Sequence, residues 1–158
     1  MRGSRRIRCL EQVLDDHQRR RVLVLLHEGA SEADLQFGFI TKLNAAGSAL
    51  IYSTFLYASG SSWIVSLAVD SSGSLVAVGT TYALDFPTTP GALRQCNPNG
   101  TWGSTGFMLK LAADGSRPVY STYLGADTLS AVAVDGAGEI YIAGNNAGTL
   151  PLVPGSFG

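Results

Sequence analysis

The apolar positions of the chain group into short segments from residue 38 onward. Residues 39–43, 50–56, 64–69 and 75–80 are rich in Val, Ile, Leu, Tyr and Thr, and several of them alternate apolar and polar positions. A period of two is typical of a pleated strand. Gly, Asp and Asn occur in the segments between them, where these residues favour tight turns. The pattern therefore predicts four short antiparallel strands.

The same pattern occurs twice, which identifies an internal repeat. The matches lie at an offset of 68 residues, then 65 and then 64, and the length differences are confined to turn-like segments. The matched segments are 38–43 with 106–111, 52–56 with 120–124, 67–70 with 132–135, and 86–91 with 150–155. Four antiparallel strands in a unit of about 50–65 residues are typical of a propeller blade. We therefore expect two repeat units, at about residues 38–93 and 106–157.

The repeated motifs resemble those of a known family. They follow the order Phe-x-x-Lys-Leu, Tyr-Ser-Thr-Tyr/Phe-Leu, Ala-Val-Asp-x-x-Gly and Phe-Pro-Thr-Thr-Pro-Gly-Ala. This order is similar to that of the SBBP family of bacterial β-propeller repeats, and the resemblance covers about residues 37–158. The second copy departs from it at residues 150–155, and Tyr57 and Ala58 stand where the family favours two glycines. The resemblance implies an all-β partial β-propeller at the cell surface or outside the cell, and it implies no particular reaction.

Side-chain size predicts how the strands are divided among sheets. Strands nearest a propeller axis are crowded, so the small residues of 66–69 and 131–134 suit that place, whereas the Tyr-Ser-Thr strands suit the wider rim. The sequence therefore predicts two outer strands of one blade, a complete blade with an excursion at 81–105, and two inner strands of a third blade. These parts are expected at residues 38–56, 64–124 and 129–145.

Two repeat units cannot close a ring, because propellers have about four to eight blades. Open strand edges invite pairing with another chain. Two interpretations therefore stay open: the chain is a piece of a longer propeller, or it completes itself by self-association.

Charge is concentrated outside the repeat. Residues 1–36 hold 7 of the 11 basic and 6 of the 12 acidic residues, whereas Gly, Ser and Thr supply 42 of the other 122 residues. Residues 10–27 have helical propensity and a broken apolar stripe. We expect residues 1–36 to be a helical or disordered extension. The alternatives are a basic amphipathic helix that docks on a partner or an anionic surface, and a sequence unrelated to the domain.

The overall balance of charge and hydropathy limits the partners. A net charge of −1 argues against nucleic acid, which would require a clustered basic surplus. No apolar run approaches the roughly 20 residues that cross a bilayer, and none fits the roughly 7–15 residues of a signal peptide. A location at the cell surface therefore depends on the resemblance alone. We expect a protein or carbohydrate ligand and no membrane span.

Two groups of residues are candidates for binding. Asp70 and Asp135 end equivalent inner strands, where they either cap turns or line a channel mouth and bind a cation or polar ligand. Trp63, Trp102 and Tyr82, with Tyr57 beside them, sit in or near loops. Exposed aromatic rings there stack on a sugar or pack against a partner, or else only anchor the loops. Lys42 and Lys110 also repeat in phase, and we expect both to face solvent.

The sequence carries no catalytic constellation. The repeat region has no His to serve as a base, and His17 and His27 have no partners at a metal spacing. Cys9 and Cys96 lie in different regions, and we do not expect them to pair. The sequence implies no cofactor and no metal. It favours a non-catalytic scaffold over two alternatives, namely a fragment of a propeller-fold hydrolase or lyase with its catalytic residues in other blades, and a non-functional gene remnant.

Overall fold

The computed structural model describes residues 36–100, 103–125, 128–146, 150 and 153–155. These residues form eight β-strands and no helix, so the predicted all-β class is confirmed for the part of the chain that is described. The strands are β1 (Phe39–Leu43), β2 (Leu50–Phe55), β3 (Ser62–Val69), β4 (Leu75–Thr81), β5 (Thr105–Leu111), β6 (Pro118–Tyr123), β7 (Thr128–Val134) and β8 (Ile140–Asn145). The extension expected at residues 1–36 lies outside the described residues, except for Gln36.

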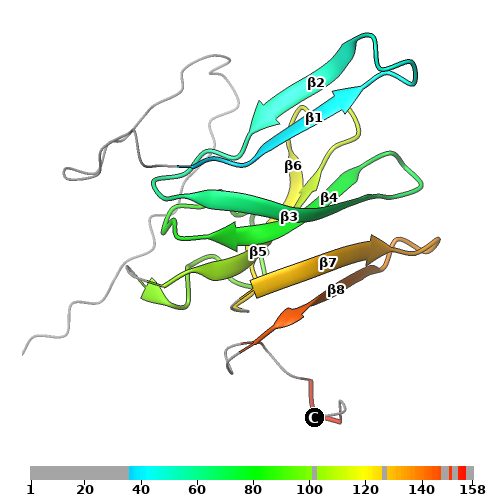
Figure 1. Cartoon of the computed structure of the whole chain (residues 1–158). Helices are drawn as coiled ribbons and strands as arrows, with labels where there is room; N and C mark the ends of the chain where they lie inside the picture. The colour runs from blue at the N-terminus through cyan, green and yellow to red at the C-terminus, as the bar shows by residue number, and fades with distance from the viewer. Residues whose placement is uncertain (1–35, 101–102, 126–127, 147–149, 151–152, 156–158) are drawn as a thin grey trace, which may run out of the picture.

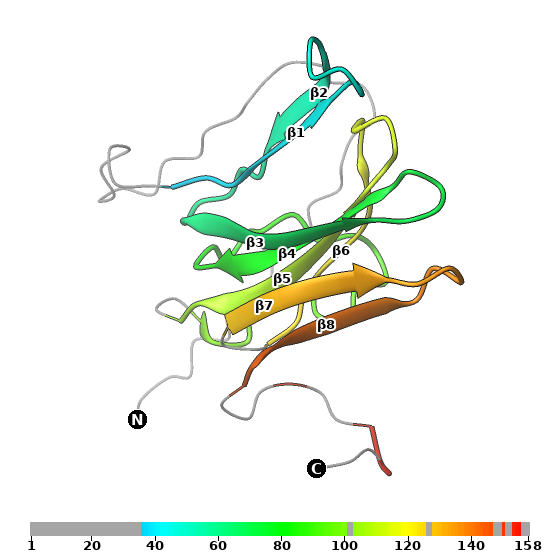
Figure 2. The ribbon, with the colours of Figure 1, turned by 45° about the vertical axis from the view of Figure 1, so that its right-hand side comes forward.

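The strands form three separate antiparallel sheets. Their orders are β1-β2, β3-β4-β5-β6 and β7-β8. The four-stranded sheet lies in the middle, with one two-stranded sheet against each of its faces (Figure 1), and the same order is visible after rotation (Figure 2). The predicted division of the strands among three sheets, at 38–56, 64–124 and 129–145, is confirmed, and the assignment of these sheets to propeller blades stays a prediction. The Ala- and Val-rich β3 and the Tyr-containing β6 lie at opposite edges of the middle sheet, as the side-chain sizes predict.

Alternate residues of β4 and β5 supply two separate cores, one on each face of the middle sheet. Toward β1-β2 lie Leu75 and Ala77 of β4 and Phe107 and Leu109 of β5, all of them buried. Ile40 of β1 packs on this side. The period of two in these strands therefore places one apolar set against each neighbouring sheet.

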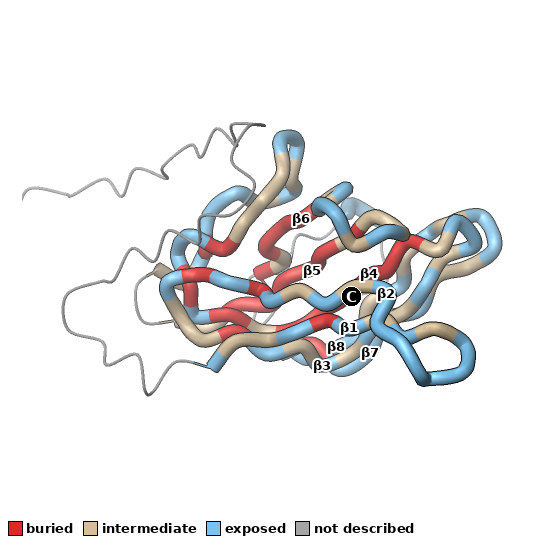
Figure 3. The backbone as a smooth tube through the Cα atoms, turned by 90° about the horizontal axis from the view of Figure 1, so that it is seen from above, coloured by how far each residue is buried: buried red, intermediate tan, exposed pale blue. Residues whose placement is uncertain are grey.

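The second core repeats the packing of the first. Val76, Val78 and Met108 of the middle sheet face β7-β8 and pack with Leu129. Met108 is the repeat equivalent of Ile40, and each of them contacts the sheet that follows its own. Figure 3 shows the buried backbone concentrated in the central strands. The molecule is thus a stack in which one sheet-on-sheet contact occurs twice.

Two equivalent glycines allow β3 to pair with β4 and β7 to pair with β8. Gly79 of β4 and Gly144 of β8 each face an irregularity in the pairing register of the neighbouring strand. A Cβ atom at these positions would overlap the backbone oxygen of Trp63 or of Thr128. Both copies therefore need glycine at this position, because the bulged backbone approaches it closely.

The segment between β4 and β5 covers the outer edge of the middle sheet. The Thr89 amide donates to Ser121 O at 3.0 Å, and the Tyr123 amide donates to Arg94 O at 3.1 Å. Phe86 inserts into the first core, with its ring centroid 4.4 Å from that of Phe107. The Phe-Pro-Thr-Thr motif therefore closes the edge of β6, which would otherwise be open to another strand.

One expectation about the cysteines is wrong. Cys96 is disulfide-bonded in the structure, although the different composition of the two regions that hold the cysteines favoured unpaired thiols. The composition of a region does not limit which residues its cysteine meets once the chain is folded. Cys9 lies outside the described residues.

Candidate functional site

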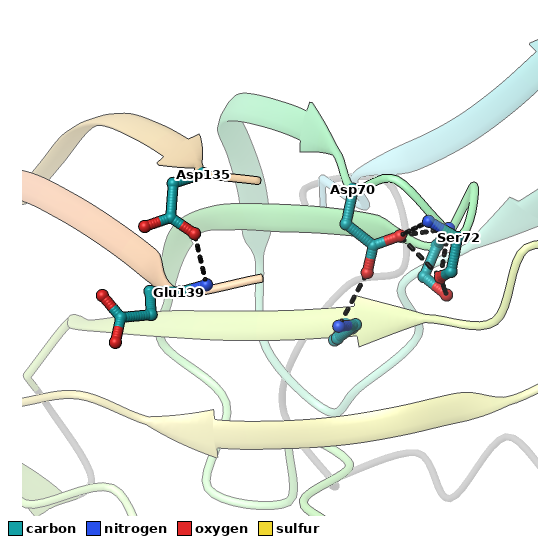
Figure 4. Close-up of polar contacts among 6 residues, drawn as sticks. Asp70, Ser72, Asp135 and Glu139 are labelled. Carbon is teal, nitrogen blue, oxygen red and sulfur yellow. Dashed lines mark hydrogen bonds and ion pairs between the residues drawn. The ribbon is translucent and has the colours of Figure 1, made fainter. Parts of the chain in front are cut away.

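The first predicted group, Asp70, organises the turn between β3 and β4. Its Oδ1 accepts hydrogen bonds from the Ser72 amide at 2.9 Å, the Ser74 amide at 3.0 Å and the Ser72 hydroxyl at 2.6 Å. The Gly73 amide donates to Asp70 O at 2.9 Å, and the φ of 82° at Gly73 is the left-handed conformation that glycine adopts easily. Figure 4 shows the Asp70 carboxylate and its contacts with Ser72.

Asp135 makes the same turn in the second copy. Its Oδ1 accepts from the Ala137 amide and the Glu139 amide, both at 2.9 Å, and the Gly138 amide donates to Asp135 O at 3.1 Å. These bonds, led by that from the Glu139 amide, hold the pKa of Asp135 below its usual range. The predicted turn-capping role is confirmed for both aspartates.

Asp70 differs from Asp135 in having a cation beside it. Lys110 Nζ lies 2.7 Å from Asp70 Oδ2, and only 6% of the Asp70 side chain and 23% of the Lys110 side chain are exposed. The ammonium group of Lys110, followed by the Ser72 hydroxyl, holds the pKa of Asp70 far below its usual range. Asp135 Oδ2 instead accepts from the Tyr141 hydroxyl at 3.1 Å, and no cation within the described ranges pairs with it.

The expectation that both repeated lysines face solvent is wrong for Lys110. Pairing of β4 with β5 places Lys110 opposite Val76, which brings its ammonium group to the Asp70 turn. Lys42 is also half-buried, with Nζ 3.4 Å from Ala113 O and 5.9 Å from the centroid of the Tyr52 ring. The alternation of a single strand could not predict this ion pair, because the pair joins two strands.

The second predicted group forms an aromatic cluster, which we define as Phe37, Tyr57, Trp63 and Tyr82. The rings of Phe37 and Tyr57 stack with centroids 4.6 Å apart. Trp63 and Tyr82 meet edge to face at 5.7 Å. The exposed fractions of Tyr57, Trp63 and Tyr82 are 42%, 39% and 47%. Three large rings therefore present part of their surface to solvent while their neighbours hold them in place.

Gln36 connects the two halves of the aromatic cluster. Trp63 Nε1 donates to Gln36 Oε1, and the Ser62 amide donates to Gln36 O at 2.8 Å. The Gln36 amide donates to Ser61 Oγ at 3.1 Å, and the Tyr82 amide donates to Ser61 O at 3.0 Å. Sequence reasoning did not identify Gln36 or Phe37, which precede the first repeated motif. The only available signal was Tyr57 at a position where the resembling family favours glycine.

The structure does not bring all of the candidates together. Trp63 lies at the start of β3 and Asp70 directly follows its end, so about 20 Å of extended strand separates them. Trp102 lies outside the described residues. The aromatic cluster and the Asp70 turn are therefore separate features at opposite ends of β3, and the Asp135 turn follows a different strand, β7.

Two further findings concern the chemistry of the described residues. They contain no group of three or more His, Cys, Asp or Glu side chains placed to hold a metal ion. The same residues contain no apolar helix of the length that a bilayer requires.

No protein-family model and no curated protein matches the chain. The resemblance to the SBBP repeats therefore stays a prediction.

Proposed function

We propose that this protein is a non-catalytic β-propeller repeat scaffold that binds a carbohydrate or protein ligand through the aromatic cluster. The observation that carries the proposal is the gathering of Trp63, Tyr82 and Tyr57 at one end of the sheet stack, with 39–47% of each side chain exposed. Loops and strand ends on a rigid scaffold are common places for binding residues.

The repeated packing supports the propeller part of the proposal. β3 and β7 are equivalent in the two copies and lie against one another, with the Val132 amide donating to Ser66 Oγ at 3.3 Å. The middle sheet packs on β7-β8 through the same kind of face contact by which β1-β2 packs on the middle sheet. In a propeller the blades surround one axis, so each blade places its inner strands beside the inner strands of the next blade and its outer strands beside the outer ones.

The composition of the aromatic cluster favours a carbohydrate over a charged ligand. Exposed rings offer flat apolar faces for sugar stacking, and the polar groups beside them are hydroxyls and an amide. The Asp85 carboxylate, three residues after Tyr82, is held by Ser59, whose amide and hydroxyl donate to Asp85 Oδ1 at 2.8 and 2.7 Å. A location at the bacterial cell surface follows from the family resemblance and belongs to this proposal.

A glycan array probed with the full chain tests the proposal, with a pull-down of surface proteins as the second arm. We expect Trp63→Ala and Tyr82→Ala to reduce ligand binding at least about tenfold, since aromatic anchors commonly dominate a contact. Leu93→Ala, a change at another exposed apolar residue, is the matched control and leaves binding unchanged. Binding that persists in both aromatic variants, or no ligand in either arm, would reject the aromatic cluster as the binding site.

A further inference from the structure

Among the described strands, β1 and β8 each have one edge with no paired strand, whereas the equivalent edges of β5 and β4 are paired. β1 is the repeat equivalent of β5, and β8 is the equivalent of β4. In the middle sheet β4 and β5 pair along seven residues, whereas β1 pairs only with β2 and β8 only with β7 among the described strands. The first sheet is thus an outer half-blade and the third an inner half-blade. They lie on opposite sides of the middle sheet, so they do not complete one another within one chain.

We propose that β8 of one copy of this chain pairs with β1 of a second copy. The product is an antiparallel sheet of order β7-β8-β1-β2, which matches the order β3-β4-β5-β6 of the middle sheet. Transfer of the β4–β5 register places Ile140 opposite Leu43, Ile142 opposite Thr41, and Gly144 opposite Phe39 of the second copy. Exposed strand edges are suited to such pairing.

Charge complementarity supports this partner. Asp135 is the equivalent of Asp70, and Lys42 is the equivalent of Lys110. Within one chain Lys110 reaches Asp70 at 2.7 Å, while no cation in the described part of the chain pairs with Asp135. In the proposed sheet, Lys42 of the second copy lies in the position that Lys110 occupies beside Asp70. The two unmatched charges then form the ion pair already present in the middle sheet.

Apolar surface beside β3 supports the same arrangement. Leu67 and Val69 are 55% and 57% exposed, and Leu67 lines a groove of about 500 Å³ along the start of β1 and β3. Their equivalents Val132 and Val134 pack against Val76 and Val78. The inner half-blade of a second copy brings Tyr141 and Ala143, the equivalents of those two valines, against Leu67 and Val69. Tyr141 is itself 56% exposed in the single chain.

The outer strands show the same complementarity. Phe86 packs on Phe107 and Tyr123, with ring centroids 4.4 and 5.9 Å apart. The equivalents of those two rings, Phe39 and Phe55, are 65% and 68% exposed. Leu150 aligns with Phe86 and follows β8, and it is 39% exposed. In the proposed assembly Leu150 covers the phenylalanine rings of the second copy.

The geometry of this contact also limits the size of the assembly. The contact joins two different edges, so it is heterologous and produces a ring when the rotation between copies closes. The described part of each chain supplies eight strands, which equal two blades. Rings of about four to eight blades therefore correspond to about two to four chains.

Two measurements on the full chain test the proposal. Light scattering over a range of concentrations is expected to give a mass that is two to four times 16.5 kDa. Carbodiimide coupling then joins amines to adjacent carboxylates without a spacer. Mass spectrometry of a mixture of ¹⁴N- and ¹⁵N-labelled chains is expected to find mixed-isotope peptides linking Lys42 to Asp135. The Lys110–Asp70 link, which joins atoms 2.7 Å apart in one chain, is the internal control and carries a single isotope.

Variants at Lys42 complete the test. Lys42→Glu places a carboxylate beside Asp135 and is expected to weaken assembly about tenfold or more, while Lys42→Arg preserves it. The thermal midpoint of the dissociated chain stays close to that of the wild type in both. A chain that remains monomeric at every concentration overturns the proposal. An oligomer that lacks the Lys42–Asp135 link and is indifferent to Lys42→Glu overturns it as well, because it uses another surface.

Discussion

Two strand pairs of this protein, β1-β2 and β5-β6, have similar sequences and very different surroundings. β1-β2 carries Phe39 and Phe55 with 65% and 68% of their surface exposed, while β5-β6 carries the equivalent Phe107 and Tyr123 with none exposed. The turns at the ends of the pairs also match, with Gly47 donating to Asn44 O at 2.9 Å and Gly115 donating to Ala112 O at 2.8 Å. The difference therefore arises from what packs against each pair and not from the pair itself.

This contrast shows that a repeat sequence encodes a sheet and both of its contact faces, whether or not the faces are covered. Each repeat in a stacked array buries its apolar faces against its neighbours. The middle sheet has a neighbour on each side, and its β4 and β5 side chains are almost entirely buried. The end sheets keep the same apolar residues and expose them.

The largest effect is expected where the two pairs differ most. Phe107→Ala removes a fully buried ring from the first core and should lower the free energy of unfolding by about 3–5 kcal/mol. Phe39→Ala, the matched change in the other pair, should alter it by no more than about 0.5 kcal/mol in the dissociated chain. Urea unfolding followed by tryptophan fluorescence measures both values.

The same pair of variants separates stability from assembly. If β1 meets a second copy as proposed, Phe39→Ala weakens assembly even though it leaves the dissociated chain stable. Equal losses of stability in the two variants at low concentration would contradict the contrast between covered and uncovered strand pairs. That result would show that Phe39 is buried in solution by something other than a second chain.

A smaller effect is expected from one hydroxyl group. The Tyr123 hydroxyl donates to Ala83 O and accepts from the Phe86 amide, both at 2.9 Å, in a site from which water is excluded. Burial there raises the pKa of Tyr123 well above its usual range. Tyr123→Phe leaves the Phe86 amide without this acceptor and should cost about 1–3 kcal/mol in the free energy of unfolding.

The first copy provides the matched control for this hydroxyl. Phe55 is the equivalent of Tyr123, and Phe55→Tyr adds a hydroxyl at an exposed position. It should change the free energy of unfolding by less than about 0.5 kcal/mol. Urea midpoints of the two variants measure the difference, and a Tyr123→Phe variant as stable as the wild type would show that these hydrogen bonds contribute no net stability.

These contrasts also mark how far the sequence could predict the structure. The strands, their turns and their division among three sheets follow from local periodicity and from the repeat, and the structure confirms them. The Lys110–Asp70 ion pair depends on the register between β4 and β5, which lies beyond a single strand's pattern. The packing of Phe86 in the first core could not be predicted either, because the Phe-Pro-Thr-Thr motif resembles a linker. Only the structure shows that this segment runs along β6. Gln36, which joins the aromatic cluster through Trp63, precedes the repeat, and the only signal for it was Tyr57 at a position where the SBBP family favours glycine.

The smallest expected effect is the loss of folding stability that the two aspartate turns contribute when the pH falls. The pKa of Asp70 is lower in the folded chain than in the unfolded chain, so the unfolded chain takes up its proton first as the pH falls. Asp70 therefore contributes stability that is fully present above the unfolded pKa of about 3.9 and is lost as the pH falls through the folded pKa. The pKa of Asp135 is lowered as well, but without the ammonium group that dominates at Asp70.

Thermal midpoints measured from pH 6 to pH 2.5 at low protein concentration distinguish the two turns. The midpoint of the wild type should fall with acid, and Asp70→Asn should flatten that fall more than Asp135→Asn does, because of these two aspartates only Asp70 has an ion pair among the described residues. Asparagine keeps an acceptor oxygen for the turn amides, so both variants retain the turns. Lys110→Met should flatten the profile as well, since it removes the largest cause of the low pKa at Asp70. Equal flattening by the two asparagine variants would mean that the turn hydrogen bonds, which both copies share, carry the pH dependence.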